Sequence, residues 1–429
     1  MRDILVTLLV FGAIPYIFRN PSFGMVMWVW ISVMNPHSQG WGFARTFPFA
    51  AIIAVVTMLS MLASKERYRL PLTPVTGCFI FFVAWMVLGS LFAFHPDQIH
   101  TQLIKVLKIM GMTLVVQMLI KEPKHIKWLI WTVVASIGYY GVKGGIFTLR
   151  SGGEFRVWGP SGTFIDGNNE MALALVMIIP LMYYLWGQLE HKWAKRGMLV
   201  SIGLCAIASL GSYSRGAALA MAAMLGFLWL KSKHKVTLGL VMLLLAPLAL
   251  VFMPEQWHER IDTINTYEQD ASAMGRINAW WMAFNLANAR PLFGGSFEIY
   301  DSVVFSLYAP IPTDIHAAHS IYFQVLGEHG WAGLLIYLTL GLLTWRTGSW
   351  VLNHARHRPD LEWAKEMVRM LQVSLLGFMV GGAFLSLVYF DVPYYLMCAM
   401  VAIRIMVQKE LQQPAPAARV EQKVEHGLA

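Results

Sequence analysis

The chain is poor in charged residues, which make up 13% of its 429 residues, against about 25% in ordinary soluble domains. This scarcity excludes a soluble globular protein. Hydrophobic residues reach 57% and form several runs near the roughly 20 residues that a helix needs to cross a bilayer. The runs are continuous rather than alternating, which favours helices over a closed β-barrel. We therefore expect an all-α polytopic membrane protein with about 12 transmembrane helices.

Signatures of cofactors are also missing. The three cysteines, Cys78, Cys205 and Cys398, lie in apolar segments without the spacing of metal ligands or an obvious disulfide pairing. The chain contains no Asp-x-Asp motif, no Walker A sequence and no cluster of cysteine and histidine. We therefore expect no metal and no other cofactor.

The formal net charge of +9 raises the possibility of nucleic-acid binding, but the placement of the cations argues against it. Basic residues gather in short loops that fall on one side of the predicted bundle: 65–69, 121–127, 192–196, 231–235 and 346–369. By the positive-inside rule these loops are cytoplasmic. We expect a membrane protein without a nucleic-acid partner, whose loop at 150–169, turn at Arg215 and longest loop face outward, away from the cytoplasm. The resemblance described below makes this membrane the bacterial inner membrane and the outer side the periplasm.

The longest polar interruption divides the chain. We expect N-terminal transmembrane helices over residues 1–253, a large periplasmic loop with helical segments over 254–319, C-terminal transmembrane helices over 320–408, and a disordered cytoplasmic tail over 409–429. The first two apolar runs are short and are broken at Arg19-Asn20-Pro21, so they either span the membrane or form a half-inserted hairpin. Loops beyond about 12–15 residues are usually functional or disordered. The large loop is rich in Trp, Tyr and Phe, so we interpret it as one wall of an active site at the membrane surface.

Two arginines stand out on the predicted outer side. Arg215 lies in Gly-Ser-Tyr-Ser-Arg-Gly at 211–216, between two apolar runs. A charge near membrane depth is costly and indicates function, although an arginine also reaches lipid phosphate from such a place. Arg276 lies in Met-Gly-Arg-Ile-Asn-Ala-Trp-Trp at 274–281. It either serves the site or pairs with a neighbouring acid, an exposed pair worth about 0–1 kcal/mol.

His319 precedes an apolar run at its water-facing end. A neutral imidazole there can take a proton from a hydroxyl, and the alternative is an interfacial histidine without a chemical role. His316 and His319 have a spacing that suits a metal, but catalytic zinc sites want three protein ligands and no third lies nearby.

Other polar residues surround the same outer region. The glycine-rich stretch at 152–170 carries Arg156 and ends in polar residues that either line a cavity or cap the next helix. Lys143, in the preceding run, is placed to point into the same cavity, whereas Asp391, between the last two runs, is a substrate contact or a turn residue. The predicted substrate-binding set is Arg276, Arg156, Lys143, Asn169, Glu170, Asp166, Tyr322 and Asp391.

These motifs form a familiar pattern. Ser-Arg-Gly at 214–216, Gly-Arg at 275–276 in a large loop, and His-Ser at 319–320 followed by Glu-x-Gly-x-x-Gly at 328–333 resemble the O-antigen ligase family. Its superfamily includes polysaccharide polymerases and protein O-oligosaccharyltransferases. Trp-Val-Trp at 28–30, Met-Asn-Pro-His at 34–37, Tyr-Gly-Val-Lys-Gly-Gly at 140–145 and Val-Trp-Gly-Pro at 157–160 resemble members described as O-glycosylation ligases. Together the resemblance covers most of residues 1–408.

The resemblance implies a glycosyltransferase of the GT-C type. Such an enzyme would move a preassembled glycan from undecaprenyl diphosphate to a sugar hydroxyl of lipid A-core at the periplasmic face, with inversion and without a metal. The family's essential arginine maps to Arg215, its loop arginine to Arg276 and its histidine to His319. His319 and Arg215 are then the catalytic residues. The family often has His-Asn where this chain has His-Ser, which leaves the histidine in place.

Three alternatives remain open. A polymerase would use almost the same site with a lipid-linked glycan as the acceptor, and a protein O-oligosaccharyltransferase would use a Ser or Thr of an exported protein. A transporter for an anionic lipid or solute would place its charges near the membrane midplane. The charges noted above lie at the outer ends of the runs instead, which favours an enzyme.

Overall fold

The computed structural model describes residues 1–231, 235–236, 239–240, 243 and 271–412, and every regular element in this part is helical. The N-terminal helices are α1 (Arg2–Arg19), α2 (Pro21–Val29), α3 (Phe49–Ala63), α4 (Pro74–Ser90), α5 (Ile99–Leu119) and α6 (Pro123–Arg150). They are followed by α7 (Asn168–Gln188), α8 (Lys192–Leu210), α9 (Arg215–Lys231), α12 (Ala271–Ala289), α13 (Ser302–Tyr308), α14 (Ile321–His354), α15 (Glu362–Gly381) and α16 (Asp391–Leu411). Short π- and 3-10 turns occupy Trp30–Met34, Pro36–Gln39, Phe43–Arg45, Pro359–Leu361 and Gly382–Phe384.

Helix α7 is the most enclosed of the candidate membrane helices, with 78% of its apolar window buried. It packs against α15, where Ser374 donates to the carbonyl of Met177 at 2.6 Å. Because most of its surface faces other helices, the sequence of α7 is apolar nearly all round, as expected of a buried helix. The core of the bundle therefore lies along α7.

Glycines allow α6 and α8 to approach closely. A Cβ on Gly141 would lie 2.4 Å from the Sγ of Cys205, and a Cβ on Gly145 would lie 2.3 Å from the carbonyl oxygen of Leu204. The two glycines are four residues apart on one face, the pattern of small residues that lets membrane helices meet backbone to backbone. The start of the 151–167 loop is thereby held against the end of α8.

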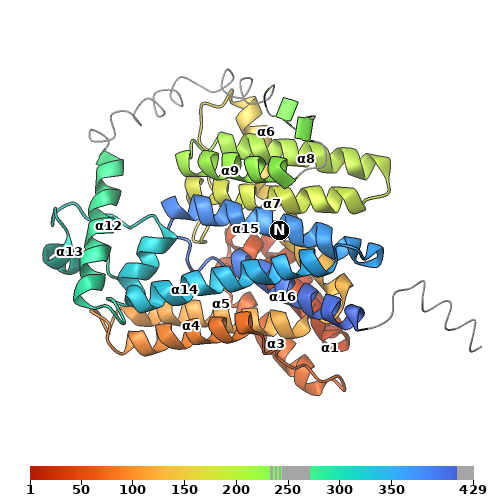
Figure 1. The fold of residues 1–429 in the computed structure, drawn as a ribbon, viewed down its shortest axis with the longest axis horizontal. Helices are drawn as coiled ribbons and strands as arrows, with labels where there is room; N and C mark the ends of the chain where they lie inside the picture. Colours follow the sequence, from red (N-terminus) through yellow and green to blue (C-terminus); the bar gives the residue numbers. More distant parts are fainter. Residues whose placement is uncertain (232–234, 237–238, 241–242, 244–270, 413–429) are drawn as a thin grey trace, which may run out of the picture.

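Helix α14 is kinked at Gly330, whose φ of 70° interrupts the helix. The interruption frees carbonyl groups, and the loop after α12 uses them: Gly295 donates to Gly327 at 2.9 Å and Ser296 donates to Glu328 at 2.7 Å. Helix α12 then stands across one end of the bundle, with α13 beside it (Figure 1). The two helices that precede His319 are thus tied to the bundle at the kink.

Five helices of the described part are long and apolar enough to cross a membrane: Ile99–Leu119, Asn168–Gln188, Lys192–Leu210, Ile321–His354 and Pro359–Phe384. Four apolar helices are shorter, at Pro21–Met34, Phe49–Ala63, Pro74–Ser90 and Arg215–Leu230. The chain is therefore a helical, multi-pass membrane protein, and the expected 12 spans and GT-C architecture stay predictions. Most of the apolar run at 237–253, which we expect to be the last of the N-terminal transmembrane helices, lies outside the described residues, as do the start of the large loop and the tail from 413.

Candidate functional site

His319 lies in the segment before α14, with its backbone in the left-handed region at φ 42°. This conformation costs a residue with a side chain roughly 1–3 kcal/mol, and it persists only where the surroundings impose it. The indole of Trp280 in α12 donates to the carbonyl of Ala318 at 2.6 Å. The ring of Trp280 also stacks on Phe323, with 5.0 Å between ring centroids. Helix α12 thus fixes the chain on both sides of His319.

Asn278 holds the preceding part of the same segment. Its amide nitrogen donates to the carbonyls of Ile311 at 2.8 Å and Asp314 at 2.9 Å. Its amide oxygen accepts from the backbone nitrogen of Ile311 at 2.9 Å. Asn278 is buried, so these bonds satisfy groups that would otherwise lie unpaired away from water. Arg276, two residues earlier in α12, shares this fixed frame.

The electrostatics of His319 depend on its burial and on Arg276. Burial lowers the pKa of His319 to about 4, with smaller contributions in the same direction from the charge of Arg276 and from His316. The imidazole is therefore neutral at neutral pH and has a lone pair to accept a proton. Among the described residues its Nδ1 atom is buried without a hydrogen-bond partner. A substrate group can supply that partner.

Gly275 makes room for the second histidine. A Cβ there would lie 2.5 Å from Nδ1 of His316, so only glycine admits this ring. Nδ1 of His316 also lies 2.9 Å from a carboxylate oxygen of Asp314, close enough for an ion pair but not aligned as a hydrogen bond. Within the described ranges no three side chains of the metal-ligating types gather together.

Arg276 also acts on Glu170, near the start of α7. The charge of the guanidinium favours the ionised carboxylate of Glu170. The side chain of Glu170 folds back over Gly167, where a Cβ would lie 2.1 Å from its Oε2 atom. A glutamate at this position of a helix reaches the first backbone amides and caps them. The charge of Arg276 thus acts on both Glu170 and His319, and we call these three residues the α12 cluster.

Arg215 begins α9 after a tightly bonded turn. The side chain of Asn168 donates to the carbonyl of Ser212 at 2.7 Å, and the hydroxyl of Tyr213 donates to the carbonyl of Gly153. These bonds join the turn before Arg215 to the 151–167 loop and to the start of α7. Arg215 and Glu170 are therefore positioned by the same junction of α7 and α9.

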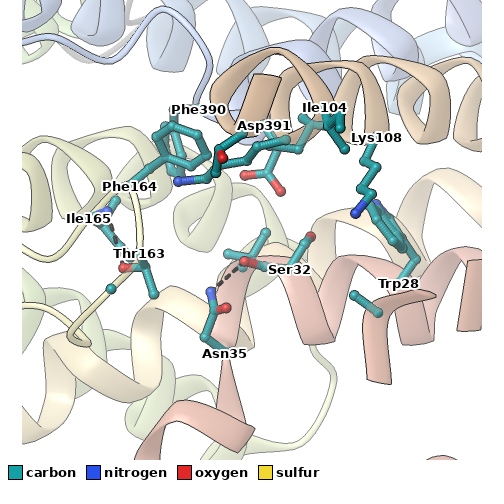
Figure 2. Close-up of a pocket in the computed structure, with 16 residues that line it drawn as sticks. Trp28, Ser32, Asn35, Ile104, Lys108, Thr163, Phe164, Ile165, Phe390 and Asp391 are labelled. Atoms are coloured by element: carbon teal, nitrogen blue, oxygen red, sulfur yellow. Dashed lines mark hydrogen bonds between the residues drawn. The ribbon is translucent and has the colours of Figure 1, made fainter. Parts of the chain in front are cut away.

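Four other predicted residues lie in separate places. Lys143 and Arg156 line one cavity together, which no residue at 166–170 and no residue of the α12 cluster lines. The hydroxyl of Tyr322 donates to the carbonyl of Met379 at 2.9 Å. Asp391 lines a cavity of about 530 Å³, and accepts from the hydroxyl of Tyr395 at 3.1 Å. Figure 2 shows Asp391 above Ser32 in this cavity, with Lys108 beside Trp28.

Asp166 and Asn169 complete the predicted set. A carboxylate oxygen of Asp166 accepts from the backbone nitrogen of Gly162 at 2.9 Å, so this side chain stabilises its own loop. Asn169 is half-buried next to Asn168. The structure therefore gathers Glu170, Arg276 and His319 and places Arg215 at the adjoining turn.

Two family models match the chain. Residues 200–338 match the model described as O-antigen ligase. This match supports membership of the O-antigen ligase family. The match supports an enzyme of the general O-antigen ligase and polymerase type, which acts on lipid-linked glycans. The matched segment contains Arg215, Arg276 and His319. Residues 1–189 match a family of unknown function (DUF5935). No curated protein matches the chain.

Three polar or aromatic residues that hold this region in place were not predicted from the sequence. Asn278 and Trp280 follow Arg276 at i+2 and i+4 in a motif that was noted for its arginine alone. Their spacing puts Arg276 and Trp280 on one helical face, and this was an available signal. The third, Glu328, is a carboxylate buried within α14, and its position in an apolar run was the signal.

Proposed function

We propose that the chain is an O-antigen ligase. It transfers a preassembled glycan from undecaprenyl diphosphate to a sugar hydroxyl of lipid A-core at the periplasmic face of the bacterial inner membrane. The observation that carries the proposal is the neutral, half-buried His319 beside Arg276. A proton acceptor next to a guanidinium suits a reaction in which a hydroxyl attacks and a phosphate leaves.

In the reaction, the acceptor oxygen forms a bond to the anomeric carbon and gives its proton to His319. The bond between that carbon and the diphosphate oxygen breaks, and the diphosphate leaves with the electron pair. Attack opposite to the leaving group inverts the anomeric configuration. Arg215 and Arg276 stabilise the charge that grows on the diphosphate, because a guanidinium binds phosphate in a bidentate geometry.

The neighbourhood of His319 couples binding to basicity. In the free protein the charge of Arg276 lowers the pKa of His319. When the diphosphate binds Arg276, its negative charge offsets the guanidinium and raises the pKa of His319. The base therefore gains proton affinity only when the donor is in place, which limits unproductive protonation in the empty site.

The test is transfer in liposomes with a chelator present. Undecaprenyl-diphosphate glycan is the donor, and rough lipopolysaccharide, a pilin-like protein or no added acceptor complete the three reactions. We expect a chelator-resistant ladder on lipopolysaccharide that is lost in His319→Ala, while donor binding is retained. Arg215→Ala should lower turnover by about 10²–10³-fold, and Arg215→Lys should restore it only in part.

The same reactions separate the competing functions. Growth of the donor glycan without an acceptor would make the enzyme a polymerase, and labelled protein would make it an oligosaccharyltransferase. No transfer in any reaction, with intact donor, would overturn the ligase proposal and return the protein to the transporter class.

A further inference from the structure

A second cationic site lies beside the 151–167 loop. A cavity of about 430 Å³ is lined by Arg2, Arg45, Lys143 and Arg156, and no acidic residue lines it. These four cations come from the start of α1, the 3-10 turn at Phe43–Arg45, α6 and the loop. All the lining residues fall within the N-terminal match at 1–189. We call this cavity the N-terminal cleft.

The charges of the N-terminal cleft are not neutralised within the described part of the chain. No ion pair of that part involves any of the four cations, and Arg2 donates only to the backbone carbonyl of Gln39, at 3.3 Å. The carboxylate of Asp3 lies nearby, where it accepts from the backbone nitrogens of Gly42 at 3.1 Å and Ala44 at 3.3 Å. Its single negative charge offsets only part of the charge of the four cations. Four like charges around one cavity create a positive potential that attracts an anion.

The floor of the cleft is a fixed surface rather than a set of free loops. Gln39 donates to the hydroxyl of Tyr140 at 2.7 Å, and Tyr140 is buried. Gly144 admits the side chain of Val157, since a Cβ at Gly144 would lie 2.7 Å from its Cγ1 atom. The turn after α2, helix α6 and the loop are thereby joined beneath the cations.

Two tryptophans line the same cleft with unusually exposed rings. Trp41 is 92% exposed and Trp158 is 61% exposed. Tryptophans often lie at a membrane interface, where one face is apolar and the other wet. Beside four cations, flat aromatic faces also suit the apolar faces of sugar rings. Cations and exposed indoles together fit a sugar that carries negative charge.

We propose that the N-terminal cleft binds an anionic sugar of the acceptor glycan, charged by phosphate or by a uronic carboxylate. The inference rests on the proposed function, because it names the part of the acceptor that the enzyme recognises. In the proposed function, Arg215 and Arg276 bind the reacting diphosphate of the donor. Residues 156–161 of the 151–167 loop line the cleft, and the end of the same loop leads into α7 and Glu170. The proposal therefore requires the acceptor glycan to extend from the cleft along this loop to the α12 cluster.

The test measures binding to the full-length protein in nanodiscs, without donor. The probe is a fluorescent, deacylated core oligosaccharide that carries phosphate, and the same oligosaccharide after enzymatic dephosphorylation is the comparison. We expect the phosphorylated probe to bind at least tenfold more tightly, and Arg45→Gln/Arg156→Gln to remove this advantage. Arg2→Gln/Lys143→Gln should do the same. Arg150→Gln, at the end of α6 but outside the cleft, should bind like the unaltered protein.

Competing ligands show whether the cleft binds phosphate or carboxylate. Displacement of the probe by inorganic phosphate or by a short oligogalacturonate would support the cleft and would assign phosphate or carboxylate as its ligand. Unchanged binding in both double variants would overturn the inference. Equal binding of the phosphorylated and dephosphorylated probes would also overturn it if oligogalacturonate displaced neither probe. Displacement by a short polyprenyl diphosphate that persists in Arg215→Ala would also overturn it, because the cleft would then be a donor site.

Transfer and probe binding together distinguish failure of the proposed function from failure of the cleft inference. His319→Ala keeps the cleft intact and should bind the probe normally although it cannot transfer. If no transfer occurs in any reaction while the probe binds through the four cations, the ligase proposal fails and the anion site stands. If transfer to lipopolysaccharide occurs at the same KM in both double variants, the cleft is not the acceptor site.

Discussion

Tyr389 and Glu328 share a hydrogen bond in the interior of the protein, with the phenol of Tyr389 as the donor. The same hydroxyl lies 2.7 Å from Nε2 of His329. Since the phenol gives its only hydrogen to Glu328, His329 must donate through Nε2, and the tautomer follows from this network. All three side chains are buried. Glu328 and His329 directly precede the kink at Gly330. The network therefore fixes the N-terminal part of α14, the part that directly follows His319 in the chain.

Removing the hydroxyl of Tyr389 should therefore destabilise the protein. Tyr389→Phe leaves Glu328 and His329 buried with one partner fewer each, at a cost of about 1–3 kcal/mol for each unsatisfied group. We expect a clearly lower melting temperature in detergent, measured by tryptophan fluorescence. Tyr322→Phe, which loses one bond to a carbonyl, is the matched control and should have a smaller effect. Equal effects of the two substitutions would argue against the network.

Asn278 should act on catalysis through the position of His319. Asn278→Ala removes three hydrogen bonds to the segment at 311–314. We expect kcat to fall while the KM for the acceptor changes little, because the acceptor site is untouched. Asn285→Ala in the same helix loses a single bond to Tyr308 and should leave kcat nearly unchanged. A fall in stability without a fall in kcat would leave Asn278 with a structural role only.

Two substitutions of His319 distinguish the backbone strain at this residue from the chemical role of its imidazole. His319→Gly removes the imidazole and also the strain of a side chain at φ 42°, whereas His319→Ala removes the imidazole alone. The glycine variant should be the more stable of the two, by roughly 1 kcal/mol. Both should be inactive, and added imidazole should restore part of the activity in the glycine variant. Activity in either variant without imidazole would exclude His319 as the base.

The pH dependence of stability should report on His319. Its pKa of about 4 in the folded protein lies below the ordinary value of 6.5, so the fold favours the neutral ring. This stabilisation is complete above pH 6.5 and is lost as the pH falls from 6.5 towards 4. Over that range the unaltered protein should lose melting temperature relative to His319→Asn. Parallel curves for the two proteins would contradict the lowered pKa.

The contribution of Arg276 to the lowered pKa of His319 can be measured directly. Arg276→Ala removes one of the two charges that lower the pKa of His319, while burial, the larger cause, remains. The pKa should therefore rise only part of the way to 6.5. The measurement is a histidine NMR titration in which the signal of His319 is assigned by its loss in His319→Asn. A pKa that does not move would place Arg276 too far away to act on the base.

The sequence predicted the class of fold well because apolar runs report burial in lipid directly. The apolar runs at 47–63, 102–120 and 170–187 predict helices, and α3, α5 and α7 agree with them within a few residues. The number of spans is less accessible, since several apolar helices are shorter than a bilayer requires. The kink at Gly330 also needs the partner loop at Gly295, which no local pattern in α14 reveals.

For the candidate site, the sequence indicated individual charged residues but not their grouping. Arg276 and His319 were selected from separate motifs, and the structure brings them together through contacts of α12. Lys143 and Arg156 were expected to share a cavity with the residues at 166–170, and they share one with Arg2 and Arg45 instead. The side of a loop that each residue faces depends on turns such as Gly159, where a Cβ would lie 1.5 Å from the carbonyl oxygen of Ile165. Such a contact exists only in three dimensions.

The close packing of α6 on α8 has a consequence for how this protein can recombine with its relatives. The two family matches meet between residues 189 and 200, which invites an exchange of halves at that boundary. However, Gly141 and Gly145 belong to one half, and Cys205 and Leu204 belong to the other. A chimera joined there would inherit surfaces that were not selected together, and one added methyl group on either glycine would separate the helices. An exchange of halves therefore keeps this packing only where the incoming half has glycine at these positions or leaves room for a larger residue.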